Sequence, residues 1–258
     1  LAAHGIAVRH ALPGVGRNLH DHVDFIFGHR AKSTDLMGVS LGGSLRMLRE
    51  LMRWRGQRRG MLSSNFAEAG GFLRKDSRSS APDFHLMFVT AMVDDHARRL
   101  HLGHGYSCHT VLLRPKSRGR VTLHGATMDR PPRIDPAFLS APEDLEDMVA
   151  GFKLARHLLR QPALARHARR DLFTEGVESD DQIRAVLRAR CDTVYHPVGS
   201  CRMGIDDGAV VDPELRVHGI GALRVVDASV MPRIVGGNTN APTMMIAERA
   251  AGFIRAAA

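Results

Sequence analysis

A single histidine occupies a turn whose composition suits catalysis. Residues 191–204 read CDTVYHPVGSCRMG, so His196 lies between Tyr195 and Pro197 and is followed by a corner of small residues. An imidazole titrates near neutral pH and can act as a general base, and a proline restricts the backbone beside it. The ordinary alternative is a histidine whose ring is satisfied by local hydrogen bonds, which is the commoner case for an isolated histidine. The turn by itself leaves both interpretations open.

A second stretch, 223–254, combines an aspartate, a Gly-Gly turn and several amides. It reads LRVVDASVMPRIVGGNTNAPTMMIAERAAGFI. The apolar run before Asp227 predicts a strand, and Pro242 and Thr243 predict the first turn of a terminal helix. The N-terminus of such a helix offers backbone N–H groups to an anion or to an electron-rich ring edge. An aspartate at the carboxyl end of a strand is where open α/β sheets bind cofactor hydroxyls.

Length and composition narrow the class of protein. The chain has 258 residues and 44% hydrophobic residues, which is enough for one large domain or two ordinary ones. No run approaches the roughly 18 apolar residues that a membrane span needs. The net charge is +9, but aromatic residues make up only 5% and do not interleave with the basic runs, so we expect no nucleic-acid partner. Three scattered cysteines predict no disulfide framework.

Hydrophobic periodicity predicts the elements that must position these residues. The expected strands are 5–12, 63–74, 82–93, 107–115, 119–125 and 222–232. The expected helices are the part of 36–57 that follows the glycines, 142–161, 179–190 and 240–257. A short turn, KSRG, joins 107–115 to 119–125 and predicts that these two strands form an antiparallel pair. The histidines of 95–109 are expected in a loop.

Six segments, taken in order, identify a family. They are LPGVGRNLHDH (12–22), FAEAGGFLR (66–74), LLRPKSRGRVTL with RIDPAFLS (112–140), YHPVGSCRMG (195–204), VVDPELRVHGIGALRVVDASVMP (210–232) and GGNTNAPTMMIAERAA (236–251). Together they resemble the glucose-methanol-choline (GMC) family of flavin oxidoreductases, in particular its bacterial choline and alcohol dehydrogenases. Each segment alone would be a weak signal, but all six in the family's order along one chain are highly specific.

The resemblance implies an FAD-dependent oxidation of a primary alcohol to the aldehyde, with hydride transfer to N5 of the flavin. His196 would take the hydroxyl proton, and Asn238 would hydrogen-bond the same oxygen. Such a base and a fixed amide donor would stabilise the alkoxide character that develops as hydride leaves. The reduced flavin would pass its electrons to oxygen or to a quinone-linked chain, in the cytoplasm or at the periphery of a membrane.

The resemblance also assigns residues to FAD and to the substrate. The residues that would contact FAD are Asp227, Ala228, Asn240, Pro242, Thr243 and Tyr195. Glu68 corresponds to a glutamate that faces the trimethylammonium group in choline-oxidising members, although members that oxidise simple alcohols carry it too. A quaternary cation favours an anion and aromatic faces. Choline and aliphatic or aromatic alcohols are therefore all candidate substrates.

The expected fold class is α+β. The resemblance assigns 1–24 to the tail of an FAD-binding domain, 25–194 to a substrate-binding domain with an antiparallel sheet and covering helices, and 195–258 to a return segment of the α/β FAD-binding domain. The G-x-G-x-x-G turn that grips the pyrophosphate of a dinucleotide is absent from the sequence. We therefore expect a C-terminal fragment that neither holds FAD firmly nor oxidises alcohols alone. The alternative is a non-catalytic basic binding module derived from such an enzyme.

Two histidine-rich segments raise the question of a metal. His101, His104, Cys108 and His109 have spacings that zinc could accept, but no second tightly spaced ligand pair follows, which favours a surface loop. His20 and His22 flank Asp21, and the family resemblance makes this segment a structural loop near the domain junction. We therefore expect no metal.

Overall fold

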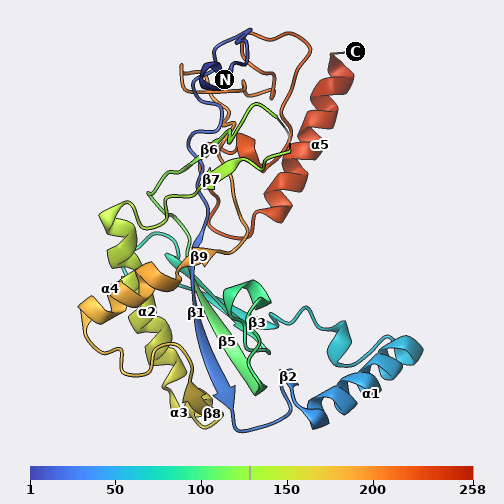
Figure 1. The fold of residues 1–258 in the computed structure, drawn as a ribbon, viewed down its shortest axis with the longest axis vertical. Helices are drawn as coiled ribbons and strands as arrows, with labels where there is room; N and C mark the ends of the chain where they lie inside the picture. Colours follow the sequence, from blue (N-terminus) through green and yellow to red (C-terminus); the bar gives the residue numbers. More distant parts are fainter. Residues whose placement is uncertain (128, 258) are drawn as a thin grey trace. The chain divides into compact units, whose positions relative to one another are not determined.

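The computed structural model describes residues 1–127 and 129–257, which divide into two compact units (Figure 1). Unit 1 comprises Leu1–Val23, Leu113–Asp144 and Thr193–Ala258. Unit 2 comprises Asp24–Leu112 and Leu145–Asp192. Each unit is built from separate stretches of the chain, and 113–144 belongs to unit 1 although it lies within the expected substrate-binding segment. The assignment of 1–24, 25–194 and 195–258 to functional domains stays a prediction.

Unit 2 is organised around a sheet. Its strands follow the order β3 (Ala69–Leu73), β4 (Phe84–Val89), β5 (Gly103–Leu112), β1 (Val23–Ala31) and β8 (Ala168–Asp171), and the short β2 (Gly38–Val39) also pairs with β5. The pairs β3–β4, β4–β5, β2–β5 and β1–β8 are antiparallel. The two-residue β9 (Asp192–Thr193) lies where the chain passes from unit 2 to unit 1.

An aromatic cluster joins this sheet to a helix. Phe25 and Phe27 of β1 point to the same face, because alternate residues of a strand share a side. Their rings lie 5.2 and 4.7 Å from that of Phe152 on α2 (Pro142–Leu159), and all three side chains are buried. α4 (Asp180–Arg190) adds Ile183 and Leu187, both fully buried. α2, the short α3 (Pro162–Ala165) and α4 lie on one side of the sheet (Figure 1).

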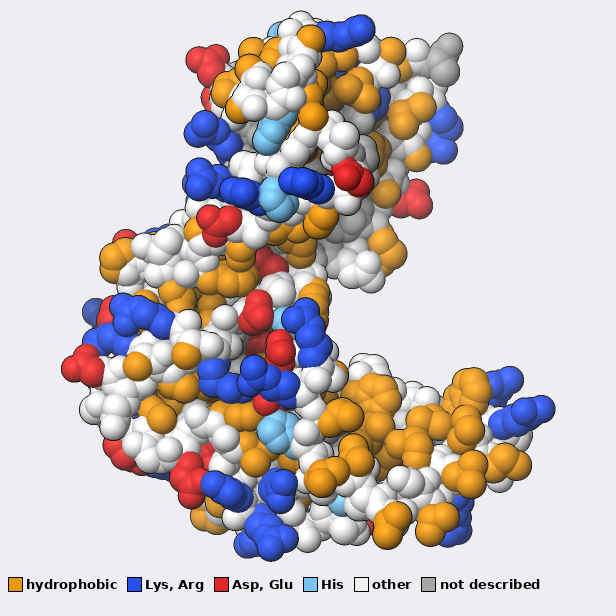
Figure 2. All heavy atoms as spheres, in the orientation of Figure 1, with side chains coloured by type: hydrophobic (Ala, Val, Ile, Leu, Met, Phe, Trp, Pro, Cys, Tyr) orange, Lys and Arg blue, Asp and Glu red, His pale blue; other side chains and the backbone are white. Residues whose placement is uncertain are grey.

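The remaining helix of unit 2 is exposed. α1 (Leu41–Gln57) begins at its N-cap Ser40, whose side chain accepts a hydrogen bond from the N–H of Gly43. None of the residues of α1 is buried, and Leu41, Leu45 and Met52 are among its exposed apolar side chains. Figure 2 shows hydrophobic side chains gathered over this helix. On the face in Figure 2, Lys and Arg side chains lie in separate groups rather than in one continuous patch.

Unit 1 consists mostly of turns around one small core. Its regular elements are the C-terminal helix α5 (Asn240–Ala256), the antiparallel pair β6 (Arg120–Thr122) and β7 (Arg133–Asp135), and 3-10 helices at Ala2–His4 and Ala228–Val230. The core joins α5 to the loops before it and contains Val198, Val210, Val211, Leu215, Val217, Val230, Met231, Ile234, Ile246 and Ala250. Both chain termini belong to this unit.

The structure confirms the α+β class, the four helices and the strands near 69–73 and 84–89, and it corrects four local predictions. Residues 5–12, all of them described, form no strand, because this exposed segment has no neighbouring strand to pair with. The segment 107–115 does not pair with 119–125: β5 pairs with β4, and β6 pairs with β7. Part of the expected loop 95–109 is strand, since β5 begins at Gly103.

The fourth correction concerns residues 222–232. They form an extended segment with one isolated bridge, Arg216 to Arg224, followed by the 3-10 helix Ala228–Val230. A strand requires a continuous partner, and here the chain turns at 219–222, where Gly219 and Ala222 have φ of 71° and 57°. Asp227 therefore lies at the N-cap of a 3-10 helix rather than at the end of a strand.

No helix within residues 1–127 or 129–257 combines the length and apolar character that crossing a bilayer requires. The three histidines of unit 2 that have zinc-like spacings have other partners. His101 bonds Asp94 at 2.9 Å, His104 bonds Ser40 at 2.8 Å, and His109 bonds Asp24 at 2.6 Å. Among the described residues, no three His, Cys, Asp or Glu side chains lie together as a metal site would require.

Candidate active site

The turn that carries His196 is held by a buried aspartate of unit 1. Asp21 is 5% exposed and accepts a hydrogen bond from the backbone N–H of His196 at 3.0 Å. Its second oxygen accepts a hydrogen bond from the hydroxyl of Thr193, and that hydroxyl in turn accepts the N–H of Tyr195 at 2.7 Å. Tyr195 has a φ of 67°, a left-handed conformation that a tyrosine rarely adopts. These bonds fix the position at which the His196 side chain leaves the backbone.

A short antiparallel ladder continues this support. His20 and Val198 exchange two backbone hydrogen bonds, of 3.1 and 2.9 Å. Gly199 follows with a φ of 91°, and a Cβ at this position would lie 2.4 Å from the carbonyl oxygen of Asn18 and 2.7 Å from the His20 ring. Only glycine fits this corner, because the conformation is left-handed and the space is filled. The residues 18–22 therefore lie beside 196–199, although they are far apart in sequence.

His20 is a structural member of this ladder. Its Nδ1 donates to the carbonyl of Asn18 at 2.7 Å, and its Nε2 accepts the N–H of Ile234 at 2.9 Å. Burial lowers the pKa of His20 to about 4; the bond to Asn18 opposes this shift and the charge of Arg118 adds to it. A neutral imidazole with one donor and one acceptor side matches these two neighbours.

His22 lies at the centre of the site. It is 1% exposed, its Nε2 lies 2.9 Å from the carbonyl oxygen of Val235, and its Nδ1 lies 3.0 Å from Nδ1 of His196. The two rings meet edge to face, with centroids 5.1 Å apart and an interplanar angle of 87°. Val235, three residues before Asn238, therefore contacts His22 through its backbone carbonyl.

Asn238 completes the group on the exposed side. Its Nδ2 lies 3.3 Å from Nε2 of His196, on the ring edge opposite His22. His196 is half-buried and Asn238 is exposed. An imidazole nitrogen and an amide N–H therefore face outward together from unit 1. A hydroxyl placed between them could give its proton to the imidazole and accept a hydrogen bond from the amide.

The chain as a whole can now be compared with known proteins. A model of the GMC oxidoreductase family matches residues 115–247, more than half of the chain. The chain belongs to the GMC oxidoreductase family. It is 46% identical over 255 residues to an alcohol dehydrogenase (acceptor) of Pseudomonas putida, an alignment that covers 98% of this chain and 46% of that protein.

Two further comparisons agree with this assignment. An oxygen-dependent choline dehydrogenase of Paraburkholderia xenovorans is 39% identical over 251 residues, covering 95% of this chain and 44% of that protein. A structure of formate oxidase from Aspergillus oryzae matches with a TM-score of 0.89 at 27% identity, covering 99% of this chain and 50% of that one. The chain spans about half the length of the curated relatives it matches.

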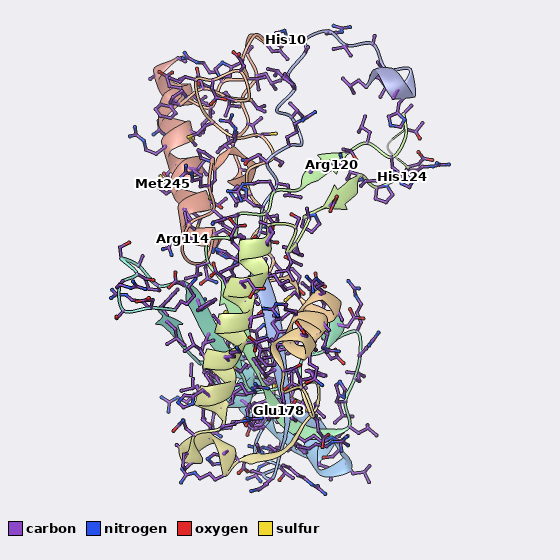
Figure 3. The ribbon with its side chains drawn as sticks, turned by 90° about the vertical axis from the view of Figure 1, so that its left-hand side faces the viewer. His10, Arg114, Arg120, His124, Glu178 and Met245 are labelled. Atoms are coloured by element: carbon purple, nitrogen blue, oxygen red, sulfur yellow. The ribbon has the colours of Figure 1, made fainter. Side chains whose placement is uncertain are left out.

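GMC oxidoreductases use FAD, and one end of α5 has the chemistry to contact it. No side chain caps the N-terminus of α5, and Asn240, its first residue, is exposed. Uncapped backbone N–H groups at a helix start favour an electron-rich ring edge. Met245 lies on the same helix and is 56% exposed, and Arg114 lies near the helix start (Figure 3). These groups fit a flavin.

The other residues predicted to contact FAD differ in exposure and in their hydrogen-bond partners. Tyr195 is 64% exposed, so most of its ring is accessible rather than packed in the core. Asp227 is exposed and accepts the N–H of Ser229 at 2.7 Å, and Ala228 packs against the core of unit 1. Pro242 lies in the first turn of α5, and the Thr243 hydroxyl donates to the Thr239 carbonyl at 2.7 Å. Their contacts with FAD stay predictions.

Glu68 belongs to the other unit. It lies directly before β3 and is exposed, outside the strand in which it was expected. Its role toward a substrate stays a prediction.

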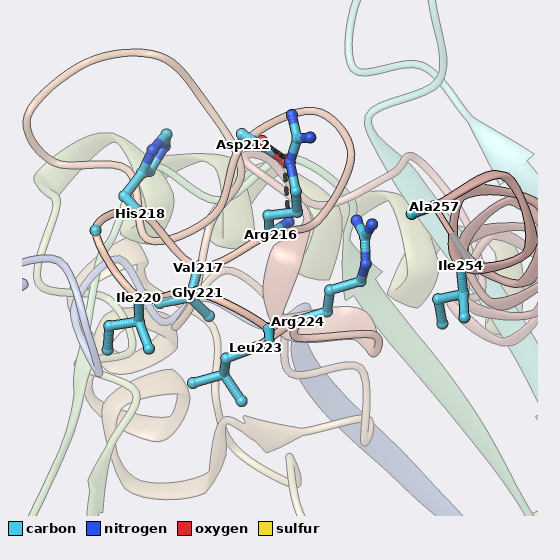
Figure 4. Close-up of a pocket in the computed structure, with 12 residues that line it drawn as sticks. Asp212, Arg216, Val217, His218, Ile220, Gly221, Leu223, Arg224, Ile254 and Ala257 are labelled. Carbon is cyan, nitrogen blue, oxygen red and sulfur yellow. Dashed lines mark hydrogen bonds and ion pairs between the residues drawn. The ribbon is translucent and has the colours of Figure 1, made fainter.

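Unit 1 also contains a hollow of about 950 Å³ (Figure 4). It is lined by residues around 212–224, by Ile254 of α5 and by Ala257 directly after that helix. The guanidinium of Arg216 donates to Asp212 at 2.7 Å. None of the candidate catalytic residues lines this hollow. The side chains of His196 and Asn238 therefore form a site that is separate from the hollow.

Sequence reasoning missed one contact of the site. His20, Asp21 and His22 were interpreted as a structural loop, and the structure confirms this for His20 and Asp21. His22, however, contacts His196 directly. The signal that could have revealed it is the placement of three polar residues immediately before the apolar run VDFIF, because polar side chains buried there require specific partners.

Proposed function

We propose that the protein to which this chain belongs oxidises a primary alcohol to the aldehyde, with His196 as the base. The observation that carries the proposal is the 3.3 Å approach of Nε2 of His196 to Nδ2 of Asn238 on an exposed face of unit 1. A general base must lie within hydrogen-bond reach of the proton it removes. The pair offers one acceptor and one donor to the same hydroxyl oxygen.

The two side chains have complementary tasks. Nε2 of His196 takes the hydroxyl proton, and the amide of Asn238 donates to the oxygen as it gains alkoxide character. A fixed donor at this position stabilises the developing charge without reorganisation. FAD, when bound, supplies the acceptor for the hydride that leaves the substrate carbon. The start of α5, with Asn240, Pro242 and Thr243, together with Tyr195, Asp227 and Ala228, would hold the cofactor.

The relatives support the type of reaction. Their printed names include an alcohol dehydrogenase (acceptor) and oxygen-dependent choline dehydrogenases. We infer that the substrate is a choline-like, aliphatic or aromatic alcohol, with Glu68 in contact with it. We further infer that the electrons pass to a quinone-linked acceptor, which favours a location at the periphery of a membrane, or to oxygen, which is compatible with the cytoplasm.

The parts of the chain have different roles in this proposal. Unit 2 supplies the antiparallel sheet of a substrate-binding domain, and 195–258 supplies the part of the FAD-binding domain that carries His196 and Asn238. Because the sequence holds no G-x-G-x-x-G turn, the 258-residue chain alone should bind FAD weakly and lack turnover. Many of its arginines are paired with acids, as Arg184 is with Glu146, which does not favour a basic binding module.

Substitution of the base tests the proposal. In the flavin-loaded protein, His196→Ala should lower kcat/KM for an alcohol substrate by roughly 10²–10⁴, the usual contribution of a general base. Stopped-flow measurement of flavin bleaching under anaerobic conditions reports the hydride-transfer step directly. The histidine is half-buried, so the protein should still fold and bind FAD.

His124→Ala is the matched control, because His124 is an exposed histidine of the same unit (Figure 3). It should leave the rate unchanged. A His196→Ala protein that bleaches its flavin at the original rate would remove His196 from the mechanism.

A further inference from the structure

The outward face of α1 is apolar. Its side chains are Leu41, Leu45, Leu48 and Met52, whose spacing places them in one row along the helix. They are 90, 72, 59 and 64% exposed. An amphipathic helix on the surface of a globular domain normally turns such a row toward its own core. Here the row is turned to solvent, and Figure 2 shows the hydrophobic side chains gathered over the helix.

A second row of α1 faces the body of unit 2. It consists of Gly43, Met47, Glu50 and Trp54, which have the same spacing and are each half-buried. A Cβ on Gly43 would lie 2.8 Å from the carbonyl oxygen of Gly38, so the start of the helix lies against β2. The carboxylate of Glu50 accepts the backbone N–H of Met61 at 2.8 Å. These contacts fix the rotation of the helix about its axis and hold the apolar row outward.

The apolar surface continues onto the strand before the helix. Val39 of β2 is exposed and forms a bridge with Leu102, which is also exposed. A hollow of about 400 Å³ lies between β2 and α1, and Met47 and Leu51 are among the side chains that line it. The exposed apolar side chains therefore belong to neighbouring elements rather than to one isolated stripe. A contiguous surface of this kind is typical of a contact with a partner.

Arginines flank the apolar row. Residues 41–60 contain six arginines and one acid, Glu50. From the geometry of a helix, Arg49 and Arg53 follow one edge of the row and Arg55 lies at the other edge. Because Glu50 belongs to the row that faces unit 2, the surface around the apolar row is positive.

We propose that α1 binds an anionic phospholipid membrane, with its apolar row among the acyl chains and its arginines at the phosphates. A leucine-rich face beside arginines is the pattern of helices that lie parallel to a membrane surface. The inference makes specific the membrane location that the proposed function includes. Its test requires no turnover and does not involve His196.

Charge favours a membrane over two other occupants of this face. A second copy of the chain would bring the arginines of two helices together around one apolar contact, and like charges side by side oppose binding. A further segment of the same protein would have to supply several acids to offset the arginines. An anionic membrane offers many negative headgroups directly above an apolar interior, which matches both features of the helix.

Vesicle binding by the full-length, flavin-loaded protein tests the proposal. The protein should sediment with vesicles of phosphatidylcholine and phosphatidylglycerol, and phosphatidylcholine alone should bind it about tenfold more weakly. Leu45→Gln combined with Leu48→Gln should lower the partition coefficient by roughly 100-fold, because each leucine contributes about tenfold when its apolar surface leaves water. Glutamine is a good helix former, so the helix should persist. The matched control is Ile205→Gln, which alters a 91% exposed apolar residue of unit 1 and should leave binding unchanged.

The arginines are tested separately. Arg49→Gln should weaken binding to the anionic vesicles by about fivefold, the contribution of one basic side chain near such a surface. Arg188→Gln removes an exposed arginine of α4 and should leave binding unchanged. Added salt should weaken the binding of the unaltered protein, because it screens exposed charges.

Several results would overturn the proposal. They are an unaltered protein that stays in the supernatant, a leucine variant that binds as the unaltered protein does, and an Ile205→Gln protein that loses as much binding as the leucine variant. If the leucine variant instead dissociates a dimer in sedimentation velocity and still binds vesicles, the face belongs to a second copy. If it melts at a lower temperature and still binds vesicles, the face belongs to another part of the same protein.

The leucine variant should bleach its flavin with an alcohol at the original rate. A failure of the membrane proposal and a failure of His196 as the base would therefore appear in different assays.

Discussion

Unit 2 holds its shape through a sheet packed on helices, whereas unit 1 holds its shape through turns that bring distant segments together. In unit 2, Phe25, Phe27 and Phe152 form a dry cluster of a kind that many apolar sequences could build. In unit 1, His20, Asp21 and His22 are buried, and each has specific hydrogen-bond partners. Hydrophobic burial is tolerant of side-chain shape, but buried polar groups tolerate few replacements.

This difference between the two units bears on where His196 and its supporting groups lie. The candidate base and its supporting groups all belong to unit 1, because a base requires a defined orientation and hydrogen bonds give direction. A fixed network also keeps the ring in place while its charge changes. The proposed function gives unit 2, with its broad sheet, the more variable task of accommodating a substrate.

The largest expected stability effect tests the core of unit 2. Phe152→Ala should reduce the free energy of unfolding by about 3–5 kcal/mol, because it leaves a cavity between α2 and β1. Amide hydrogen exchange should show lost protection in β1, β4 and β5, with a much smaller effect on α5 of unit 1. Equal losses in both units would show that their cores unfold as one.

The next prediction tests the polar network of unit 1. His20 has a folded-state pKa of about 4 against 6.5 in the unfolded chain, so the unfolded state binds more protons between these values. The stability contribution of neutral His20 is complete above pH 6.5 and is lost as the pH falls toward 4. The expected loss is about 3 kcal/mol over this range.

Urea unfolding at pH 7 and pH 4.5 measures this effect. His20→Asn cannot titrate, so its stability should fall less between the two pH values than that of the unaltered protein. The carboxylates are common to both proteins, and their contribution cancels in the difference. Parallel losses in the two proteins would contradict the lowered pKa of His20.

The smallest effect concerns a single helix end in unit 2. Ser179 caps α4: its side chain accepts the N–H of Gln182, and the Gln182 side chain accepts the N–H of Ser179. Ser179→Ala should cost about 1 kcal/mol of unfolding free energy. Ser179→Asp, which keeps an acceptor at the cap, is the control, and thermal unfolding should rank it close to the unaltered protein.

The helices and several strands could be predicted because their signals are local. A cap at Ser179, a proline at 142 or 242 and an apolar stripe each act within a few residues. The errors arose where a strand needs a partner elsewhere: 5–12 and 222–232 have suitable composition but no continuous neighbour, and 107–115 pairs with β4 instead of its neighbour in sequence. β propensity depends on such context more than helix propensity does.

The candidate site likewise has a part that the sequence could predict and a part that it could not. The family resemblance pointed to His196 and Asn238, and the structure places their side chains 3.3 Å apart. Their chemical roles stay predictions. The polar run before the buried strand indicates that His22 needs a specific partner, but no local pattern identifies that partner as His196.

The sequence by itself determined the family, the helices and the residue types available for chemistry. Only the tertiary structure decided which nitrogen of His196 faces outward. Hydrogen bonds are short and directional, so the protonation of a ring depends on atoms within about 3 Å of it. For His196, those atoms come from His22 and Asn238. Their distances to the ring follow from the fold of unit 1 rather than from their positions in the sequence.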